Sequence, residues 1–260
     1  MNDLKTYLPL LTIALLVACS SQQSDKKTKE VSKEVDKATE VVNKAIEWAG
    51  GMDSWNSLMT INYTKRSRLL LEDESIEFDI TQQHSYLMKP SLSMDINWTT
   101  DKGDHRLFHS DTASLNFLNG SLIDSGDKVQ QSAFSAFYVL GMPFKLKDPG
   151  TYLSYAGSQE FNGQTADVIK ASYSPEEHDN HSTSDQWWYY FDQSTGAFLG
   201  CMVYHAPTYA LIENLAFHEV EGVKFQKRRM SYRCDSLGNK QFLRAEFWYE
   251  DYDVTFSQGD

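Results

Sequence analysis

The sequence is poor in cysteine, proline and positive charge. It contains three cysteines and six prolines, and its 24 lysines and arginines stand against 36 aspartates and glutamates, giving a formal net charge of −12. Nucleic-acid binding requires clustered basic residues, so this balance argues against it. The same balance disfavours broad adhesion to anionic lipid head groups.

Long apolar runs are also scarce. The one candidate covers residues 7–18, which are too few to span a bilayer and include Pro9. With Lys5 ahead of it, this stretch predicts a secretory signal peptide over residues 1–18. No other window approaches about 18 consecutive apolar residues, so we expect the rest of the chain to be soluble.

The predicted signal peptide ends in a sequence that indicates lipidation. Leu16-Val17-Ala18-Cys19 resembles the lipobox of bacterial lipoproteins, in which the cysteine receives a diacylglyceryl group and cleavage occurs just before it. The resemblance implies acyl groups such as palmitate on Cys19, and two or three acyl chains anchor a protein stably. We therefore expect a lipid-anchored protein of the cell envelope, at the outer membrane and facing the periplasm or the cell surface. An ordinary cleaved signal or an uncleaved anchor is the alternative.

The segment after the lipobox changes character twice. Residues 19–29 are a predicted polar tether, because they contain no apolar residue after the cysteine. Over residues 30–49 apolar side chains recur every three or four positions, which predicts an amphipathic helix closed by Gly50-Gly51. A short helix with Asp53 or Ser54 as N-cap should follow.

From residue 60 onward the apolar period changes from near 3.6 to 2, as in Ile76, Phe78 and Ile80. This period predicts antiparallel strands with one wet face, within a single domain over residues 30–260. Turn-forming pairs such as Asn119-Gly120 separate the strands and suit a meander. The predicted strands cover residues 60–71, 76–80, 92–98, 105–110, 114–118, 152–161, 164–173, 186–192, 197–205, 210–219, 222–234 and 240–252.

Two features indicate that the sheet curls around other elements. Residues 129–142 carry apolar side chains at helical spacing and end at Gly141 and Pro143, which predicts a helix packed on the sheet. The strands at 187–191 and 198–204 are apolar on both sides, so both of their faces should be covered. A sheet curled around a helix or a ligand would cover them.

Together these features resemble the lipoprotein-carrier (LolA/LolB-like) family of periplasmic chaperones and outer-membrane receptors. The likeness rests on the lipobox, Ala49-Gly50-Gly51 and Trp55 before the first strand, a mid-domain segment from Met142 to Gly150, and a hairpin from Tyr190 to Gly196. It implies a mainly β fold, a curled antiparallel sheet or incomplete barrel of about 11–12 strands. The N-terminal amphipathic helix and one internal helix would then pack on the concave side.

In that family the cavity binds acyl chains or other amphiphiles without covalent chemistry. The resemblance therefore implies an envelope lipoprotein that is not an enzyme, uses no cofactor and holds a lipid or another amphiphile in an apolar cavity. The alternative is a solid core, which would make the protein a structural or interaction module of the envelope. The residues assigned to the cavity are aromatic or methionine: Trp98, Phe108, Phe134, Phe137, Tyr190, Met202, Phe217 and Trp248.

Polar residues form no convincing catalytic or metal site. The segment from Glu176 to His181 with Asp185 is interpreted as a solvated loop. His105 and His109, with Asp104 and Asp111 nearby, would share a strand face, but exposed histidines on strands are common, so no metal is predicted. No Gly-x-Ser-x-Gly motif or Gly-rich phosphate loop is present. A hydrolase of envelope polymers or glycans is a third alternative, and it would need two carboxylates about 5–10 Å apart in a cleft.

The two cysteines after the lipobox leave two interpretations open. Cys201 and Cys234 could form a disulfide in an oxidising periplasm. They could equally be buried free thiols in neighbouring strands. Their spacing does not decide between the two.

Overall fold

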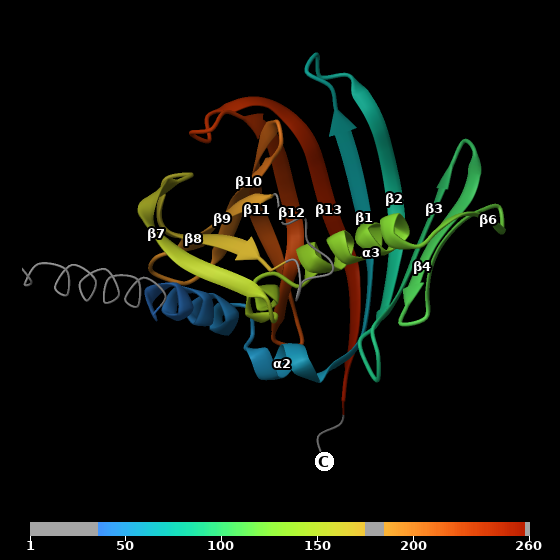
Figure 1. The fold of residues 1–260 in the computed structure, drawn as a ribbon, viewed down its shortest axis with the longest axis horizontal. Helices are drawn as coiled ribbons and strands as arrows, with labels where there is room; N and C mark the ends of the chain where they lie inside the picture. The colour runs from blue at the N-terminus through green and yellow to red at the C-terminus, as the bar shows by residue number, and fades with distance from the viewer. Residues whose placement is uncertain (1–35, 175–184, 258–260) are drawn as a thin grey trace, which may run out of the picture.

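The computed structural model describes residues 36–174 and 185–257, which form one antiparallel sheet of 13 strands with the helices on one side (Figure 1). Successive side chains of a strand point to opposite faces of the sheet, and one face is buried. In β2, for example, buried His84 and Tyr86 alternate with exposed Gln83 and Ser85. The strands are β1 (Leu58–Leu70), β2 (Ile76–Leu87), β3 (Ser93–Thr100), β4 (Gly103–Ser110), β5 (Ala113–Leu118), β6 (Ser121–Ser125), β7 (Thr151–Phe161), β8 (Gln164–Tyr173), β9 (Gln186–Asp192), β10 (Phe198–His205), β11 (Thr208–Val220), β12 (Val223–Cys234) and β13 (Lys240–Phe256).

The sheet is a meander with one long-range pairing. Its strand order is β6-β5-β4-β3-β2-β1-β13-β12-β11-β10-β9-β8-β7, so every neighbour is also a neighbour in the chain except β1 and β13. The pairing of β1 with β13 joins the first and last strands in the middle of the sheet, for example at Lys65 opposite Tyr249. The sheet stays open, because β6 and β7 lie at its two edges.

The segment between the two edge strands crosses one face of the sheet. It contains helix α3 (Asp127–Leu140) and the 3-10 helix η1 (Phe144–Lys147). Figure 1 shows α3 running across the strands from the β6 side toward the β7 side. The helix buries a stripe at Val129, Ala133 and Phe137, spaced by four residues, against the sheet. We call the face of the sheet that lies under α3 the inner face and the opposite face the outer face.

The N-terminal helix packs beside the C-terminal half of the sheet. Its described part, residues 36–48, buries Ala38, Val42 and Ala45 completely. Gly50 follows with φ of 117°, and a Cβ there would lie 2.3 Å from the carbonyl oxygen of Gly222. Only glycine allows this contact between the end of the helix and the β11–β12 turn.

Helix α2 (Met52–Ser57) connects this helix to β1. Its N-cap is Gly51, which makes no side-chain hydrogen bond, so the prediction of Asp53 or Ser54 as N-cap was wrong. Trp55 on this helix is buried. Within residues 36–174 and 185–257, no helix is both long enough and apolar enough to cross a membrane.

The predicted fold class is confirmed: a curled antiparallel sheet with an internal helix on its concave side. The structure has one strand more than the upper predicted number, the edge strand β6. All five residues of β6 are exposed, including Leu122 and Ile123, so it lacks the alternation that marked the other strands. The prediction that β9 and β10 are covered on both faces is also confirmed, since Tyr189 and Tyr190 are both buried.

Candidate functional site

A cavity of about 580 Å³ lies between the inner face of the sheet and α3. Small-molecule sites typically measure about 300–1,000 Å³, so this cavity has the size of a ligand site. Helix α3 contributes Ser132, Ser135, Ala136 and Val139, which share one helical face. Ser132 and Ser135 are also exposed to solvent, so the cavity reaches the surface beside the helix.

Most of the sheet wall of the cavity is apolar. Ile96 on β3 and Leu107 on β4 come from the first half of the chain, and Phe198, Cys201 and Ile212 come from the second half. Ile96 lies opposite Leu107, and Cys201 lies opposite Ile212, so the members of each pair share the inner face. Phe198 is three residues before Cys201, and the register shift between Phe198 and Gly200 allows it to line the same cavity. An apolar ligand chain placed against them would gain about 25 cal/mol for each Å² of apolar surface buried.

One part of the wall is polar and lies where the two halves of the sheet meet. Lys65 on β1 stands beside Gln82 on β2 and Tyr249 on β13. Arg229 on β12 stands opposite Phe247 on β13. Four adjacent strands therefore bring two cationic side chains to the inner face of the sheet.

Lys65 and Arg229 approach the same aromatic ring. The Lys65 Nζ lies 5.4 Å and the Arg229 Cζ 5.9 Å from the centroid of Phe247. Arg229 is buried, and its guanidinium donates hydrogen bonds to the Asn214 Oδ1 (3.1 Å) and the Tyr249 hydroxyl (3.2 Å). Both of these partners are neutral, so they orient the guanidinium without neutralising its charge.

His84 adds an uncharged polar group to the same wall. Its Nδ1 lies 2.8 Å from the Tyr86 hydroxyl and 3.1 Å from the Tyr63 hydroxyl, whereas its Nε2 is buried without a hydrogen-bond partner among the described residues. Burial, followed by the charge of Lys65, lowers the pKa of His84 well below its ordinary value. The ring is therefore neutral at pH 7, and one of its two nitrogens carries the proton.

Tyrosine hydroxyls connect α3 to the sheet beside the cavity. The hydroxyl of Tyr138 on α3 bonds that of Tyr173 on β8, which lies 3.0 Å from the hydroxyl of Tyr189 on β9. Burial raises the pKa of Tyr173 to about 12. These three groups stay protonated at neutral pH and hold the helix over β8 and β9 as neutral hydrogen-bond partners.

The sequence and the fold both match known families. The model of a family of unknown function, DUF6503, matches residues 5–214. The chain belongs to this family. No curated protein is similar enough in sequence to match it.

Two solved structures share the fold of this DUF6503 protein at low sequence identity. A LolA superfamily protein from Nitrosomonas europaea is 9% identical, with a TM-score of 0.53, over 85% of this chain and 94% of the other. A putative outer membrane lipoprotein-sorting protein domain from Vibrio parahaemolyticus is 10% identical, with a TM-score of 0.56, over 87% and 95% of the two chains. The DUF6503 protein therefore has the incomplete-barrel fold of the lipoprotein-carrier family.

The eight residues predicted to line the cavity separate into several environments. Trp98 lines the cavity, whereas the other seven are absent from the lining formed by the described residues. Four of these seven, Phe108, Tyr190, Met202 and Trp248, are each the neighbour of a lining residue on the same strand. Because neighbouring side chains in a strand point to opposite faces, these four lie on the outer face.

The remaining three predicted residues lie on the inner side but pack elsewhere. Phe134 on α3 packs on His109, and Phe137 packs between Trp55 and Tyr86. Phe217 makes an edge contact with Trp48 of the N-terminal helix, with ring centroids 4.8 Å apart. All three fill contacts between elements around the cavity.

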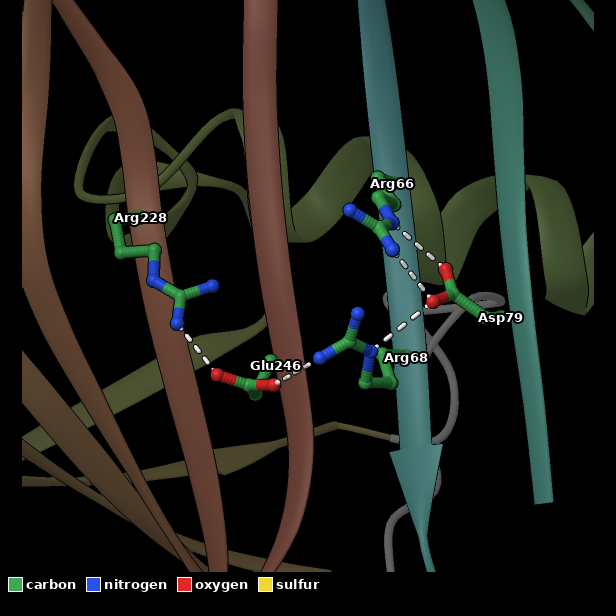
Figure 2. Close-up of polar contacts among 5 residues, drawn as sticks. All are labelled: Arg66, Arg68, Asp79, Arg228 and Glu246. Atoms are coloured by element: carbon green, nitrogen blue, oxygen red, sulfur yellow. Dashed lines mark hydrogen bonds and ion pairs between the residues drawn. The ribbon is translucent and has the colours of Figure 1, made fainter. Parts of the chain in front are cut away.

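The outer face carries an ion-pair network across strands β2, β1, β13 and β12, which we call the seam of the sheet (Figure 2). Asp79 on β2 accepts two hydrogen bonds from Arg66, at 2.8 and 2.6 Å, and one from Arg68 at 3.0 Å. Glu246 on β13 accepts from Arg68 at 3.4 Å and from Arg228 on β12 at 2.5 Å. The network connects β2, β1, β13 and β12 where the two halves of the DUF6503 chain meet.

Trp248 lies within this network. The guanidinium of Arg228 lies 3.9 Å from the Trp248 ring, and those of Arg66 and Arg68 lie 5.0 and 5.5 Å away. Three cations over one indole make cation–π contacts on the outer face. Trp248 therefore packs against the arginines of the seam and not against the cavity.

Among residues 36–174 and 185–257, no group of three or more histidine, cysteine, aspartate or glutamate side chains is arranged to hold a metal ion. His105 stacks on Trp98 with ring centroids 4.9 Å apart, and the Nδ1 of His109 lies 2.8 Å from the Ser114 hydroxyl. The segment from Glu176 to His181 lies outside the described residues. Asp185 accepts a hydrogen bond from His205 at 2.7 Å.

The two cysteines of the β domain are free and buried. Cys201 lines the inner cavity, whereas Cys234 packs with Tyr190 and Met202 in a second apolar cluster on the outer face. The sheet lies between the two thiols. The structure therefore agrees with the interpretation that Cys201 and Cys234 are buried free thiols and not with the disulfide.

Proposed function

We propose that this chain is a cell-envelope protein that binds a lipid or another amphiphile without covalent chemistry in the cavity under α3. The observation that carries the proposal is the cavity of about 580 Å³, with a mostly apolar sheet wall and a polar patch at one part of it. A cavity of this kind suits a molecule with an apolar body and a polar end. The alternative of a solid core does not accommodate a void of this size.

The hydrolase alternative has less support from the same cavity. Glycoside hydrolysis needs two carboxylates that flank the scissile bond. The lining contributed by residues 36–174 and 185–257 contains no aspartate or glutamate. The amphiphile-binding role is therefore the function that the site supports best.

Binding can be tested by filling the cavity from the helix side. Ala136 lines the cavity on α3, whereas Gln131 on the same helix is exposed and lies outside the lining. Ala136→Trp should place an indole in the cavity and weaken binding of a fluorescent fatty acid by at least about tenfold, which corresponds to about 1.4 kcal/mol. Gln131→Trp is the matched control and should bind like the wild type.

Two measurements complete this test. Thermal unfolding of both variants establishes that they remain folded. Mass spectrometry of a gentle organic extract of the wild-type protein should find a co-purified amphiphile. If the extract contains none and the wild type does not bind the fluorescent fatty acid, the proposed function is wrong.

We further propose that Cys19 anchors the protein to the outer membrane, facing the periplasm or the cell surface. The support is the lipobox Leu16-Val17-Ala18-Cys19, together with a fold shared with a putative outer membrane lipoprotein-sorting protein domain. Cells fed a clickable palmitate analogue should incorporate it into the wild type and not into Cys19→Ser. Equal incorporation into both proteins would contradict anchoring at Cys19.

A further inference from the structure

The polar patch of the cavity carries positive charge without a matching negative charge. Lys65 and Arg229 both line the cavity, and neither forms an ion pair with a carboxylate in the described part of the chain. Arg229 is only 8% exposed. Removing an uncompensated cation from water costs several kcal/mol, so an anion beside it would be strongly favoured.

The neighbours of these two residues show that the chain does not lack acids to pair with them. Arg66 follows Lys65 on β1 and pairs with Asp79 on the outer face. Arg228 precedes Arg229 on β12 and pairs with Glu246 on the outer face (Figure 2). The outer-face member of each adjacent pair therefore has a carboxylate partner, and the cavity-facing member has none.

The two cations flank β13 and approach the same ring on it. Lys65 Nζ and Arg229 Cζ lie 5.4 and 5.9 Å from the same Phe247 ring. Arg229 donates its hydrogen bonds to described residues through Nε and Nη1, and its Nη2 donates to none of them. A carboxylate or phosphate can accept from a guanidinium and an ammonium together.

A third polar group faces the same cavity. His84 is 2% exposed and lines the cavity beside Lys65, and its buried Nε2 has no partner among the described residues. Buried polar groups are normally satisfied in native proteins, so an unpaired one in a cavity wall indicates a missing polar partner. This observation is independent of the two charges and points to the same kind of ligand.

We infer that the cavity selects an anionic amphiphile, whose carboxylate or phosphate head is held by Lys65 and Arg229 while its apolar chain lies under α3. The inference rests on the proposed amphiphile binding and names the chemical class of the ligand. The head accepts hydrogen bonds from the ammonium, the guanidinium and His84. The chain covers the apolar wall formed by residues such as Ile96, Phe198 and Ile212.

The test compares three ligands with the same acyl or alkyl chain on the wild-type protein. Hexadecanoic acid carries a carboxylate, a palmitoyl lysophosphatidic acid carries a phosphate, and hexadecanol is neutral. Each displaces an uncharged fluorescent probe from the purified protein. We expect at least one of the two anionic ligands to bind about tenfold or more tightly than hexadecanol, because a charge-assisted pair replaces an unpaired cation.

Variants assign the selectivity to the two cations. Lys65→Met and Arg229→Met should each weaken binding of the preferred anionic ligand by about tenfold and leave hexadecanol binding unchanged. Lys227→Met, at an exposed position on β12, is the matched control and should preserve the wild-type selectivity. The comparison of ligands on the wild type needs no variant, so it remains decisive if Arg229→Met fails to fold.

The outcomes separate this inference from the proposed function. If hexadecanol binds as tightly as both anionic ligands, the inference is overturned and amphiphile binding stands. If none of the three ligands displaces the probe and the probe itself does not bind, the proposed function fails. A preference for the acid alone identifies a carboxylate ligand, and a preference for the lysophosphatidic acid alone identifies a phosphate; either supports the anionic head.

Discussion

Trp55 on α2 stacks on Phe144 of η1, with ring centroids 4.7 Å apart and ring planes 8° from parallel. The contact joins the N-terminal helices to the segment that crosses the inner face. The chain makes room for the indole at Gly141, where a Cβ would lie 3.2 Å from Trp55. This stacking holds η1, which follows the C-terminal end of α3, against α2.

The stacking predicts a large effect of truncation. Trp55→Ala should lower the free energy of unfolding by about 3–5 kcal/mol, because it removes a buried aromatic and leaves a void. Trp55→Phe keeps an aromatic face toward Phe144 and should lose less. Urea denaturation measures both. Leu237→Ala, at a side chain that is 84% exposed, is the control and should change stability by no more than about 0.5 kcal/mol.

The seam of the sheet depends on the carboxylate shared by two arginines. Glu246 is 13% exposed and pairs with Arg68 and Arg228. Glu246→Gln keeps the shape but removes the charge, and it should lower the free energy of unfolding by about 2 kcal/mol. Glu40→Gln, which removes an ion pair with Lys37 at a 71% exposed side chain, should cost about 0.5 kcal/mol or less. Equal effects of the two changes would contradict the role of the seam.

Asp79 makes stability depend on pH. Hydrogen bonds from Arg66, followed by those from Arg68, lower the pKa of Asp79 from 3.8 to about 2. Its contribution is therefore fully present above about pH 4 and is lost as the pH falls toward 2. Because the group is partly solvated, we expect Asp79→Asn to cost about 1 kcal/mol at pH 7 and nearly nothing at pH 2. Unfolding of both proteins across this range, with Asp101→Asn as control, measures the difference; a cost that does not change with pH would count against it.

The thiols provide a chemical test of the fold. Burial raises the pKa of Cys201 to about 11, so little thiolate exists at pH 8. Iodoacetamide should therefore leave Cys201 unmodified in the native protein and alkylate both Cys201 and Cys234 after unfolding without reductant. Peptide mass spectrometry distinguishes the two states. A peptide pair linked through Cys201 and Cys234 would contradict the placement of the thiols on opposite faces.

The architecture was largely predictable from the sequence, because the apolar period identifies strands and helices before any tertiary contact is known. Residues 129–142 were predicted as a helix packed on the sheet, and α3 occupies 127–140. The strand β6 was not predicted, because its exposed Leu122 and Ile123 give no alternation. An edge strand that is paired on one side and solvated on both faces leaves little pattern in its sequence.

The residues that line the cavity were much harder to predict, because the sequence does not show which face of a strand turns inward. On β9 and β10 both faces are apolar, so alternation shows which residues share a face and not which face turns inward. The prediction selected Tyr190 and Met202, whereas Tyr189 and Cys201 line the cavity. Met202 is larger and more flexible than Cys201, whereas Tyr189 and Tyr190 are the same residue type, so residue type could not decide the side; the curvature of the whole sheet does.

The cationic residues were missed because nothing in their local sequence distinguishes them. Lys65 adjoins Arg66 and Arg229 adjoins Arg228, so each reads as part of a short basic run on a strand. Their meeting depends on the pairing of β1 with β13 and of β13 with β12, which brings together positions more than 160 residues apart. Long-range pairing of this kind is a property of topology and leaves no local signal.

The connection between β6 and β7 links the helix over the cavity to both edge strands of the sheet. Because α3 and η1 lie in the chain between the edge strands β6 and β7, α3 cannot move far from the sheet without displacing at least one of these strands. Under the proposed function, a movement of α3 that admits a ligand would also move an edge of the sheet. Under the same proposal, a cross-link between either edge strand and its neighbour would slow both uptake and release of the ligand, although it would lie outside the cavity.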